Sequence, residues 1–164
     1  MDDSLYDPYE AICLIDPSAS PAPMNAPGMV VVDDSKEFRA PLKEIAKFEG
    51  KSIGYGRFNG ECAAGVQWAL RTNGVMIGLT KTWREGRKVR GNYIAPGTAI
   101  ASFRDGVYKN DHAAIFVSQD DDGIVVYDQF NRPKKPWGKR KLYFDTNRSR
   151  GRSNNGDYFY TIVT

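Results

Sequence analysis

Short segments of alternating apolar and polar residues fill most of the chain after residue 97, and this pattern restricts the fold more than any other feature. A period of two places the apolar side chains on one face of a β-strand. Asn, Asp, Gly and Pro between the segments favour turns. We therefore expect five strands, at Thr98–Phe103, His112–Ser118, Ile124–Phe130, Arg140–Phe144 and Asp157–Val163.

One convincing helix is expected before these strands. Apolar residues between Cys62 and Leu70 recur at helical spacing, and Asn73-Gly74 favours a helix end. A shorter helix is expected between Leu42 and Gly50. Helices followed by a run of antiparallel strands indicate an α+β fold, with the helix that begins at Cys62 packed on the sheet.

The first 40 residues differ from the rest in composition. Residues 1–27 contain five prolines, so we interpret residues 1–40 as an acidic, proline-rich arm and residues 41–164 as one domain. Residues 1–37 hold eight acids and one base, whereas residues 38–164 hold 22 bases and 12 acids. Such an asymmetry indicates either that the arm docks on the basic body or that the body meets an anionic partner, unless the charges only solvate the surface.

Length and hydropathy limit the class of protein. A chain of 164 residues can form one domain with a real core, and it has no apolar run long enough to span a bilayer. The start of the chain lacks the basic and apolar blocks of a signal peptide, so export would need another route. Its two cysteines, Cys13 and Cys62, do not make a disulfide framework, and we interpret Cys13 as a small apolar residue.

The single histidine, His112, is the centre of the expected site. Cys62 precedes it by fifty residues, at the start of the expected helix, and Asp128 follows it by sixteen, on the next expected strand. If the turn between those strands is centred on Asp120, then His112 lies directly opposite Asp128. A register shifted by two residues would keep both side chains on one face and make the pair diagonal.

This order of residues suits thiol chemistry. A cysteine attacks only as a thiolate, and a helix N-terminus together with an adjacent imidazole lowers its pKa. We therefore predict Cys62 as nucleophile, His112 as base and Asp128 as the carboxylate that orients the base. No metal-ligand spacing is present, because Asp120-Asp121-Asp122 indicates a solvated turn, and the mechanism needs no cofactor.

Several blocks of the chain, between about residues 45 and 131, resemble one bacterial group. They are Gly60-Glu61-Cys62-Ala63, Trp83…Gly86…Val89-Arg90-Gly91-Asn92, Pro96–Phe103, His112–Ile115 and Asp128-Gln129. Together they resemble the papain-like amidases of the NlpC and CHAP type, and most of all the small peptidoglycan amidase effectors of type VI secretion.

The resemblance implies a papain-like core and a cysteine amidase that cleaves peptide bonds in peptidoglycan stem peptides. It implies an antibacterial effector that is secreted without a signal peptide, acts in the periplasm of a target cell and has a cognate immunity protein. Tyr55 then either contacts substrate or packs in its loop. Trp83 and Arg84 either line the cleft or anchor a surface loop.

Two other functions are compatible with the residues. Basic residues between positions 134 and 152, interleaved with Trp137 and Tyr143, are typical of nucleic-acid binding, although no nucleic-acid motif accompanies them. A non-catalytic papain-like protein would keep the fold without contact between Cys62 and His112. We expect a peptidoglycan substrate, with neither nucleic-acid binding nor membrane insertion.

Overall fold

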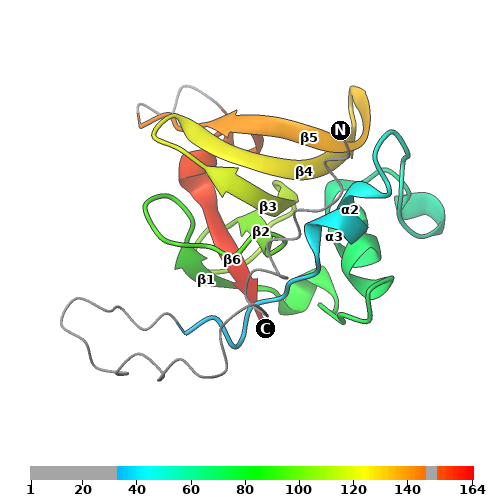
Figure 1. The fold of residues 1–164 in the computed structure, drawn as a ribbon, viewed down its shortest axis with the longest axis horizontal. Coiled ribbons are helices and arrows are strands. Elements are labelled where there is room, and N and C mark those ends of the chain that lie inside the picture. The colour runs from blue at the N-terminus through cyan, green and yellow to red at the C-terminus, as the bar shows by residue number, and fades with distance from the viewer. Residues whose placement is uncertain (1–32, 147–150) are drawn as a thin grey trace, which may run out of the picture. The chain divides into compact units, whose positions relative to one another are not determined.

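A computed structural model describes residues 33–146 and 151–164. Its main element is a six-stranded antiparallel sheet with the strand order β1-β6-β2-β3-β4-β5 (Figure 1). The strands are β1 (Arg84–Lys88), β2 (Ala99–Ser102), β3 (Ala113–Gln119), β4 (Gly123–Asn131), β5 (Lys134–Tyr143) and β6 (Phe159–Val163). The α+β class and the five predicted strands are therefore confirmed.

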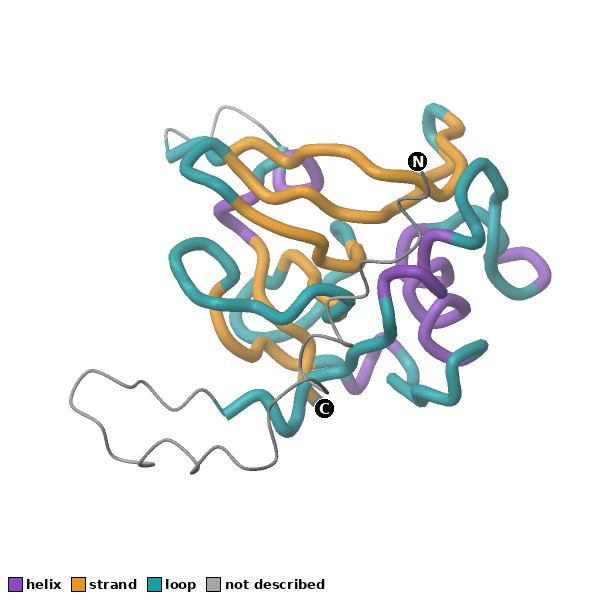
Figure 2. The backbone as a smooth tube through the Cα atoms, viewed as in Figure 1, coloured by secondary structure: helices purple, strands orange, loops and turns teal. Residues whose placement is uncertain are grey.

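The helices gather beside the sheet, as Figure 2 shows. They are α2 (Leu42–Ala46) and α3 (Cys62–Arg71), with short 3₁₀ turns at Gly56–Phe58, Thr80–Thr82, Arg152–Asn154 and Gly156–Tyr158. The helix α3 packs against β3 and β4 through a face that includes Val66, Ala69 and Leu70. Within the described residues, no helix has the length and apolar character that crossing a membrane would require.

A glycine allows α3 to lie close to the sheet. A Cβ atom added at Gly65 would lie 2.8 Å from the side-chain nitrogen of Gln129 and 2.9 Å from the ring of Trp137. Both of those side chains are buried, so neither has free space into which to move. The small residue in the middle of α3 therefore fixes how near the helix comes to β4 and β5.

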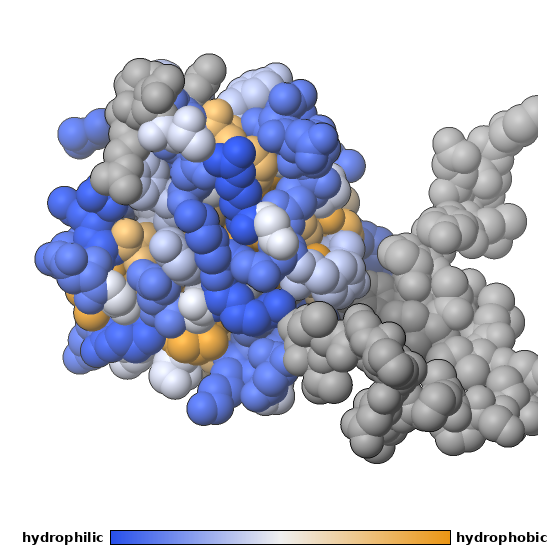
Figure 3. Space-filling model, turned by 90° about the vertical axis from the view of Figure 1, so that its left-hand side faces the viewer, coloured by the Kyte–Doolittle hydropathy of each residue, from blue (hydrophilic) through white to orange (hydrophobic). Residues whose placement is uncertain are grey.

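Both faces of the sheet carry apolar clusters, and the side chains of β3 divide between them. Ala113 and Ile115 belong to the cluster that includes α3, whereas Ala114 and Phe116 belong to a second cluster with Phe159. Burial on both faces explains why these strands contain little charge. The face of the molecule away from the helices is mainly hydrophilic (Figure 3).

Two predictions about strands were incomplete. Residues 84–88, which are outside the five predicted strands, form β1, and β5 begins at Lys134 rather than Arg140. Both strands lie at the edges of the sheet, where one side of the backbone lacks a strand partner. Edge strands tolerate charge, as in β1, and proline, as at Pro136, so neither segment shows an apolar alternation.

The compact unit of the structure starts at Asp34 and so includes residues 34–40 of the predicted arm. The amide of Ala40 donates to the carbonyl of Gly97, and Phe38 accepts from the amide of Ala99. Residues 38–40 and 97–99 therefore lie side by side as an antiparallel pair. The rest of the predicted arm, residues 1–32, which includes Cys13, lies outside the described residues.

Candidate active site

The helix α3 begins at Cys62, and the strand β4 holds its start in place. The buried side chain of Gln129 accepts a hydrogen bond from the amide of Ile53 and donates to the carbonyl oxygens of Ile53 and Glu61, at 2.9, 2.7 and 2.9 Å. Gly60 has a φ of +86°, which favours glycine in the turn before the helix. These contacts set the position of the thiol relative to the sheet.

His112 lies just before β3 and its ring is buried. Its Nε2 atom is 2.7 Å from Oδ2 of Asp128, and the two side chains are 3% and 0% exposed. The backbone of His112 exchanges hydrogen bonds with Ser102 on β2, because the amide donates to the Ser102 hydroxyl and the carbonyl accepts from the Ser102 amide. The predicted contact between His112 and Asp128 is therefore confirmed.

The register that produces this contact is the alternative one, shifted by two residues from a hairpin centred on Asp120. The structure pairs Phe116 with Val126 and Ile115 with Tyr127, and an irregularity separates these pairs from Ser118 and its partner. His112 and Asp128 are therefore diagonal rather than directly opposite. The extra residue in β3 could not be foreseen, because bulges depend on packing more than on residue type.

Asp128 is surrounded by cations that the sequence reading did not include. Nε of Arg140 lies 2.6 Å from Oδ2, and Nζ of Lys135 lies 3.1 Å from Oδ1. Burial raises the pKa of the Asp128 carboxyl, but the hydrogen bond and charge of His112 and the charges of Arg140 and Lys135 outweigh it and hold the pKa below its ordinary value. Asp128 is therefore ionised.

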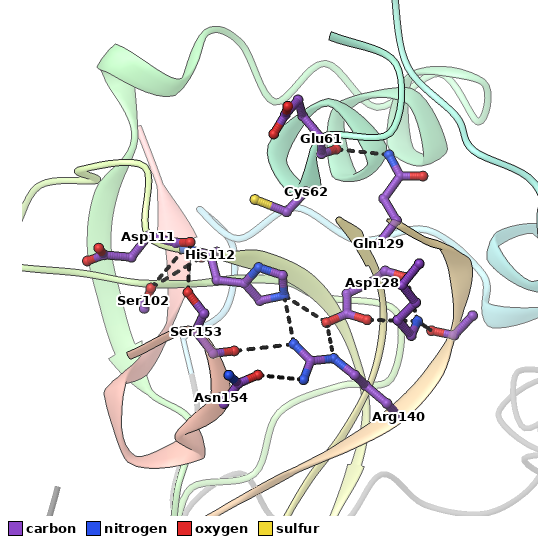
Figure 4. A network of polar contacts seen from close by, with 12 residues as sticks. Glu61, Cys62, Ser102, Asp111, His112, Asp128, Gln129, Arg140, Ser153 and Asn154 are labelled. Carbon is purple, nitrogen blue, oxygen red and sulfur yellow. Dashed lines mark hydrogen bonds and ion pairs between the residues drawn. The ribbon is translucent and has the colours of Figure 1, made fainter. Parts of the chain in front are cut away.

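The carboxylate of Asp128 determines which nitrogen of His112 carries a hydrogen, because an ionised Oδ2 only accepts and Nε2 must therefore donate. The Nη2 atom of Arg140 lies 3.3 Å from the same Nε2. The same guanidinium donates to Oδ1 of Asn154 and to the carbonyl of Ser153 (Figure 4). The opposite edge of the ring, with Nδ1, faces Cys62.

The titration behaviour of His112 follows from these neighbours. Burial alone lowers the pKa of the imidazole, but hydrogen bonds to Asp128 and Cys62, and the negative charges of both, raise it above its ordinary value. The imidazolium is therefore favoured when the thiolate and carboxylate are present.

Cys62 responds in the opposite direction. Burial raises the pKa of its thiol, but the hydrogen bond and positive charge of His112 outweigh burial, helped by the backbone of Ala113 and the hydroxyl of Tyr108. The pKa is lowered, and the thiol is free rather than bridged. The Tyr108 hydroxyl lies 3.7 Å from Sγ. The pair therefore favours thiolate and imidazolium, the charge state of an activated cysteine.

Two cavities meet at the thiol. One, of about 570 Å³, lies beside the start of α3, and the other, of about 470 Å³, lies beside His112. Cys62, Glu61 and Asn110 line both. A chain-like ligand can therefore pass over the sulfur with one part in each cavity. Among the described residues, no cluster of three or more His, Cys, Asp or Glu side chains is arranged to hold a metal ion.

The three residues predicted to bind substrate lie elsewhere. Trp83 is fully buried in the core, so the prediction that it lines the cleft is wrong. The rings of Tyr55 and Trp68 pack at a tilt of 58°, with centroids 4.7 Å apart, and Arg84 donates to the carbonyls of Lys81 and Trp83. Neither Tyr55 nor Arg84 lines the two cavities at Cys62. Trp83 does support the site indirectly, because its ring lies 5.0 Å from that of Tyr108.

Four residues of the site were missed: Lys135, Arg140, Tyr108 and Gln129. Gln129 follows the predicted acid directly. Lys135 and Arg140 lie on β5, among the basic residues that the sequence analysis considered for nucleic-acid binding. A period-two reading of β5 would have found Arg140, because the register places it opposite Val126, on the same face as Asp128. Nothing in the sequence singles out Tyr108 among nine tyrosines.

Comparison with known proteins identifies the family. A family model described as domesticated amidase effector 2 matches residues 30–162. The chain belongs to this family. It is 37% identical over 117 residues to a type VI secretion amidase effector 2 protein of Salmonella typhi, a match that covers 62% of this chain and 84% of the relative.

Further relatives agree with this assignment. A domesticated amidase effector 2 of Ixodes scapularis is 45% identical over 87 residues, which is 51% of this chain and 58% of the relative. The solved structure of a type 6 secretion amidase effector 2 is similar with a TM-score of 0.58 and 34% identity, covering 72% of this chain and 90% of that one. The resemblance to small amidase effectors is confirmed, and membership implies hydrolase activity on amide bonds.

Proposed function

We propose that this chain is a papain-like cysteine amidase that hydrolyses amide bonds in the stem peptides of peptidoglycan. The observation that carries the proposal is the arrangement of one cysteine, one histidine and one aspartate. The Cys62 thiol has a lowered pKa, the His112 imidazole beside it has a raised pKa, and Asp128 binds the far side of the ring. Membership of an amidase effector family supports the choice of bond.

The reaction uses the resting ion pair directly. The Cys62 thiolate attacks the amide carbon, and the carbonyl oxygen takes the negative charge of the tetrahedral intermediate. When the intermediate collapses, the C–N bond breaks and Nδ1 of His112 gives its proton to the departing nitrogen. A thioester and a free amine result. Water then gives a proton to Nδ1 and attacks the thioester, which releases the acid and restores the thiolate.

The position of His112 gives the cleft a direction. Because His112 protonates the leaving nitrogen, the amine part of the substrate occupies the cavity that His112 lines. The acyl part then occupies the cavity beside Ala63 and Phe58 on the other side of the sulfur. Asp128 holds the ring so that one nitrogen serves both halves of the reaction.

The biological setting follows the family. A type VI secretion amidase effector is a protein delivered into another cell, so this chain acts on the peptidoglycan in a target-cell periplasm. A producing bacterium would then need an immunity protein, and the two open cavities at Cys62 offer the surface on which an inhibitor would block the thiol.

Digestion of purified peptidoglycan by the full chain tests the proposal. Mass spectrometry of the released muropeptides would identify the amide bond that is cut. Both Cys62→Ala and His112→Ala should lower the rate by roughly 10³-fold or more, since each removes a group that takes part in bond making or proton transfer. Folded variants with unchanged activity would exclude the mechanism.

The two alternatives now have less support. Trp137, one of the two aromatic residues of the nucleic-acid interpretation, is fully buried, and Arg140 and Lys135 are bound to Asp128. A non-catalytic protein would not need Cys62 beside His112, yet both line one cavity and the imidazole lowers the pKa of the thiol. If the wild-type protein does not digest peptidoglycan, the nucleic-acid-binding and the non-catalytic alternatives should both be tested.

A further inference from the structure

Tyr108 lies on the side of Cys62 away from Asp128 and takes no part in the proton transfers described above. It belongs to the loop between β2 and β3, four residues before His112. Its ring packs against Trp83 and Phe103, with centroids 5.0 and 6.3 Å away. Its hydroxyl lies 3.7 Å from Sγ of Cys62, within reach of a hydrogen bond to sulfur, and Tyr108 lines the acyl cavity together with Cys62.

The charged groups around this hydroxyl decide its role. Burial raises the pKa of Tyr108 first, and the charges of Cys62, Asp111 and Glu61 raise it further. A phenol surrounded by anions keeps its hydrogen, so it acts as a donor rather than as an acceptor. Among the described groups that lower the pKa of Cys62, His112 is the one that carries a positive charge, and it approaches the sulfur from the other side.

We propose that Tyr108 is a catalytic residue whose hydroxyl donates a hydrogen bond to the Cys62 thiolate. Together with His112 it stabilises the anion from two directions, and no bond is made or broken at its oxygen. The proposal deepens the proposed function by adding a residue to the same site. It concerns the charge state of the sulfur, so it can be tested without peptidoglycan.

The hydrogen bond from Tyr108 would increase the fraction of Cys62 that is thiolate at low pH. Loss of a neutral hydrogen bond to an anion destabilises that anion, so the thiol pKa of a variant without the hydroxyl should be higher. Catalysis should weaken below that pKa and recover above it, because there the thiolate forms without help. Structural damage would lower the rate at every pH.

The test uses Tyr108→Phe, which removes only the hydroxyl and keeps the ring between Trp83 and Phe103. The matched control is Tyr160→Phe, because Tyr160 also packs against Phe103, at 6.5 Å, but does not contact Cys62. Alkylation by iodoacetamide is followed against pH in the full chain, and mass spectrometry of the peptide that contains Cys62 separates it from Cys13. Circular dichroism confirms that each variant is folded.

In Tyr108→Phe the alkylation midpoint should rise by about half to one pH unit. The control should match the wild type. A midpoint in Tyr108→Phe that equals that of the wild type, or falls below it, overturns the proposal. If the wild-type thiol is alkylated as an activated cysteine but the protein leaves peptidoglycan intact, the proposed function fails while the Tyr108 result still decides this inference.

Discussion

The two sides of the His112 ring differ in how completely they are filled. On one side, Asp128 is buried and bound by Arg140 and Lys135, and Arg140 is itself bound to Asn154. On the other side lies the Cys62 thiol, with the hydroxyl of Tyr108 at 3.7 Å and two cavities that open beside the sulfur.

The difference teaches how the site divides its tasks. The filled side sets which ring nitrogen carries hydrogen and keeps the carboxylate ionised, so it needs many fixed contacts. In the proposed reaction, the open side admits a substrate carbonyl and releases an amine, so permanent partners there would obstruct the reaction. Substitutions on the filled side should therefore change titration and stability together, whereas those near the sulfur should change reactivity.

The largest effect is expected from Asp128→Asn. The amide cannot balance the charges of Arg140 and Lys135, and the hydrogen bond that raises the pKa of His112 is weakened. Activity should fall by roughly 10³-fold, measured as kcat on peptidoglycan fragments, and the thermal midpoint should fall as well. The control Asp120→Asn changes an exposed carboxylate that pairs with Lys141, and it should leave both quantities almost unchanged.

A smaller effect is expected from Arg140→Gln. Loss of this cation removes one cause of the lowered pKa of Asp128, so that pKa should rise toward its ordinary value. A carboxylate with a depressed pKa contributes stability above its unfolded pKa and loses it as pH falls through the folded pKa. Acid unfolding of Arg140→Gln should therefore begin at a higher pH than in the wild type.

The catalytic rate of Arg140→Gln should fall by roughly tenfold, because Asp128 and the His112 ring lose one of their fixed neighbours. A suitable control is Lys139→Gln, since Lys139 is the neighbouring cation on β5 and lies over the ring of Tyr127 instead. Identical acid-unfolding curves for the Arg140 variant and the wild type would show that the cation does not hold Asp128 ionised.

The smallest effect is expected from Gly65→Ala, which acts through the helix that carries Cys62. The new methyl group would meet Gln129 and Trp137 at less than 3 Å, so α3 must move away from the sheet. The thermal midpoint should fall by several degrees, as for an overpacked core position. The control Gly138→Ala meets nothing closer than 3.7 Å and should change the midpoint little; equal shifts would refute the packing argument.

The three central side chains of the candidate site could be predicted because each has a distinctive place in the chain. His112 is the sole histidine, Cys62 opens the most regular helical pattern, and Asp128 is an acid inside a strand, where acids are disfavoured. Alternation also predicts that His112 and Asp128 share a face. These are local properties, so one sequence is enough to find them.

The supporting residues could not be predicted in the same way. Trp83 stands directly before the charged residues of β1, which favours a position at the surface. Its side chain is nevertheless buried in the core, and the sequence does not reveal that packing. Tyr108 reaches Cys62 only because of the path that the loop between β2 and β3 takes. Tertiary packing determines both positions, and no periodicity records it.

The extra residue in β3, between Phe116 and Ser118, divides the β3–β4 hairpin into two parts with different registers. The end of the hairpin near His112 and Asp128 follows one register. The turn at Asp120–Asp122 follows the other register, and Asp120 accepts hydrogen bonds there from the amides of Asp122 and Gly123. For a protein engineer, this turn is a natural insertion point. A short peptide tag or a fluorophore attached there would report on the enzyme's location while His112 and Asp128 keep their alignment.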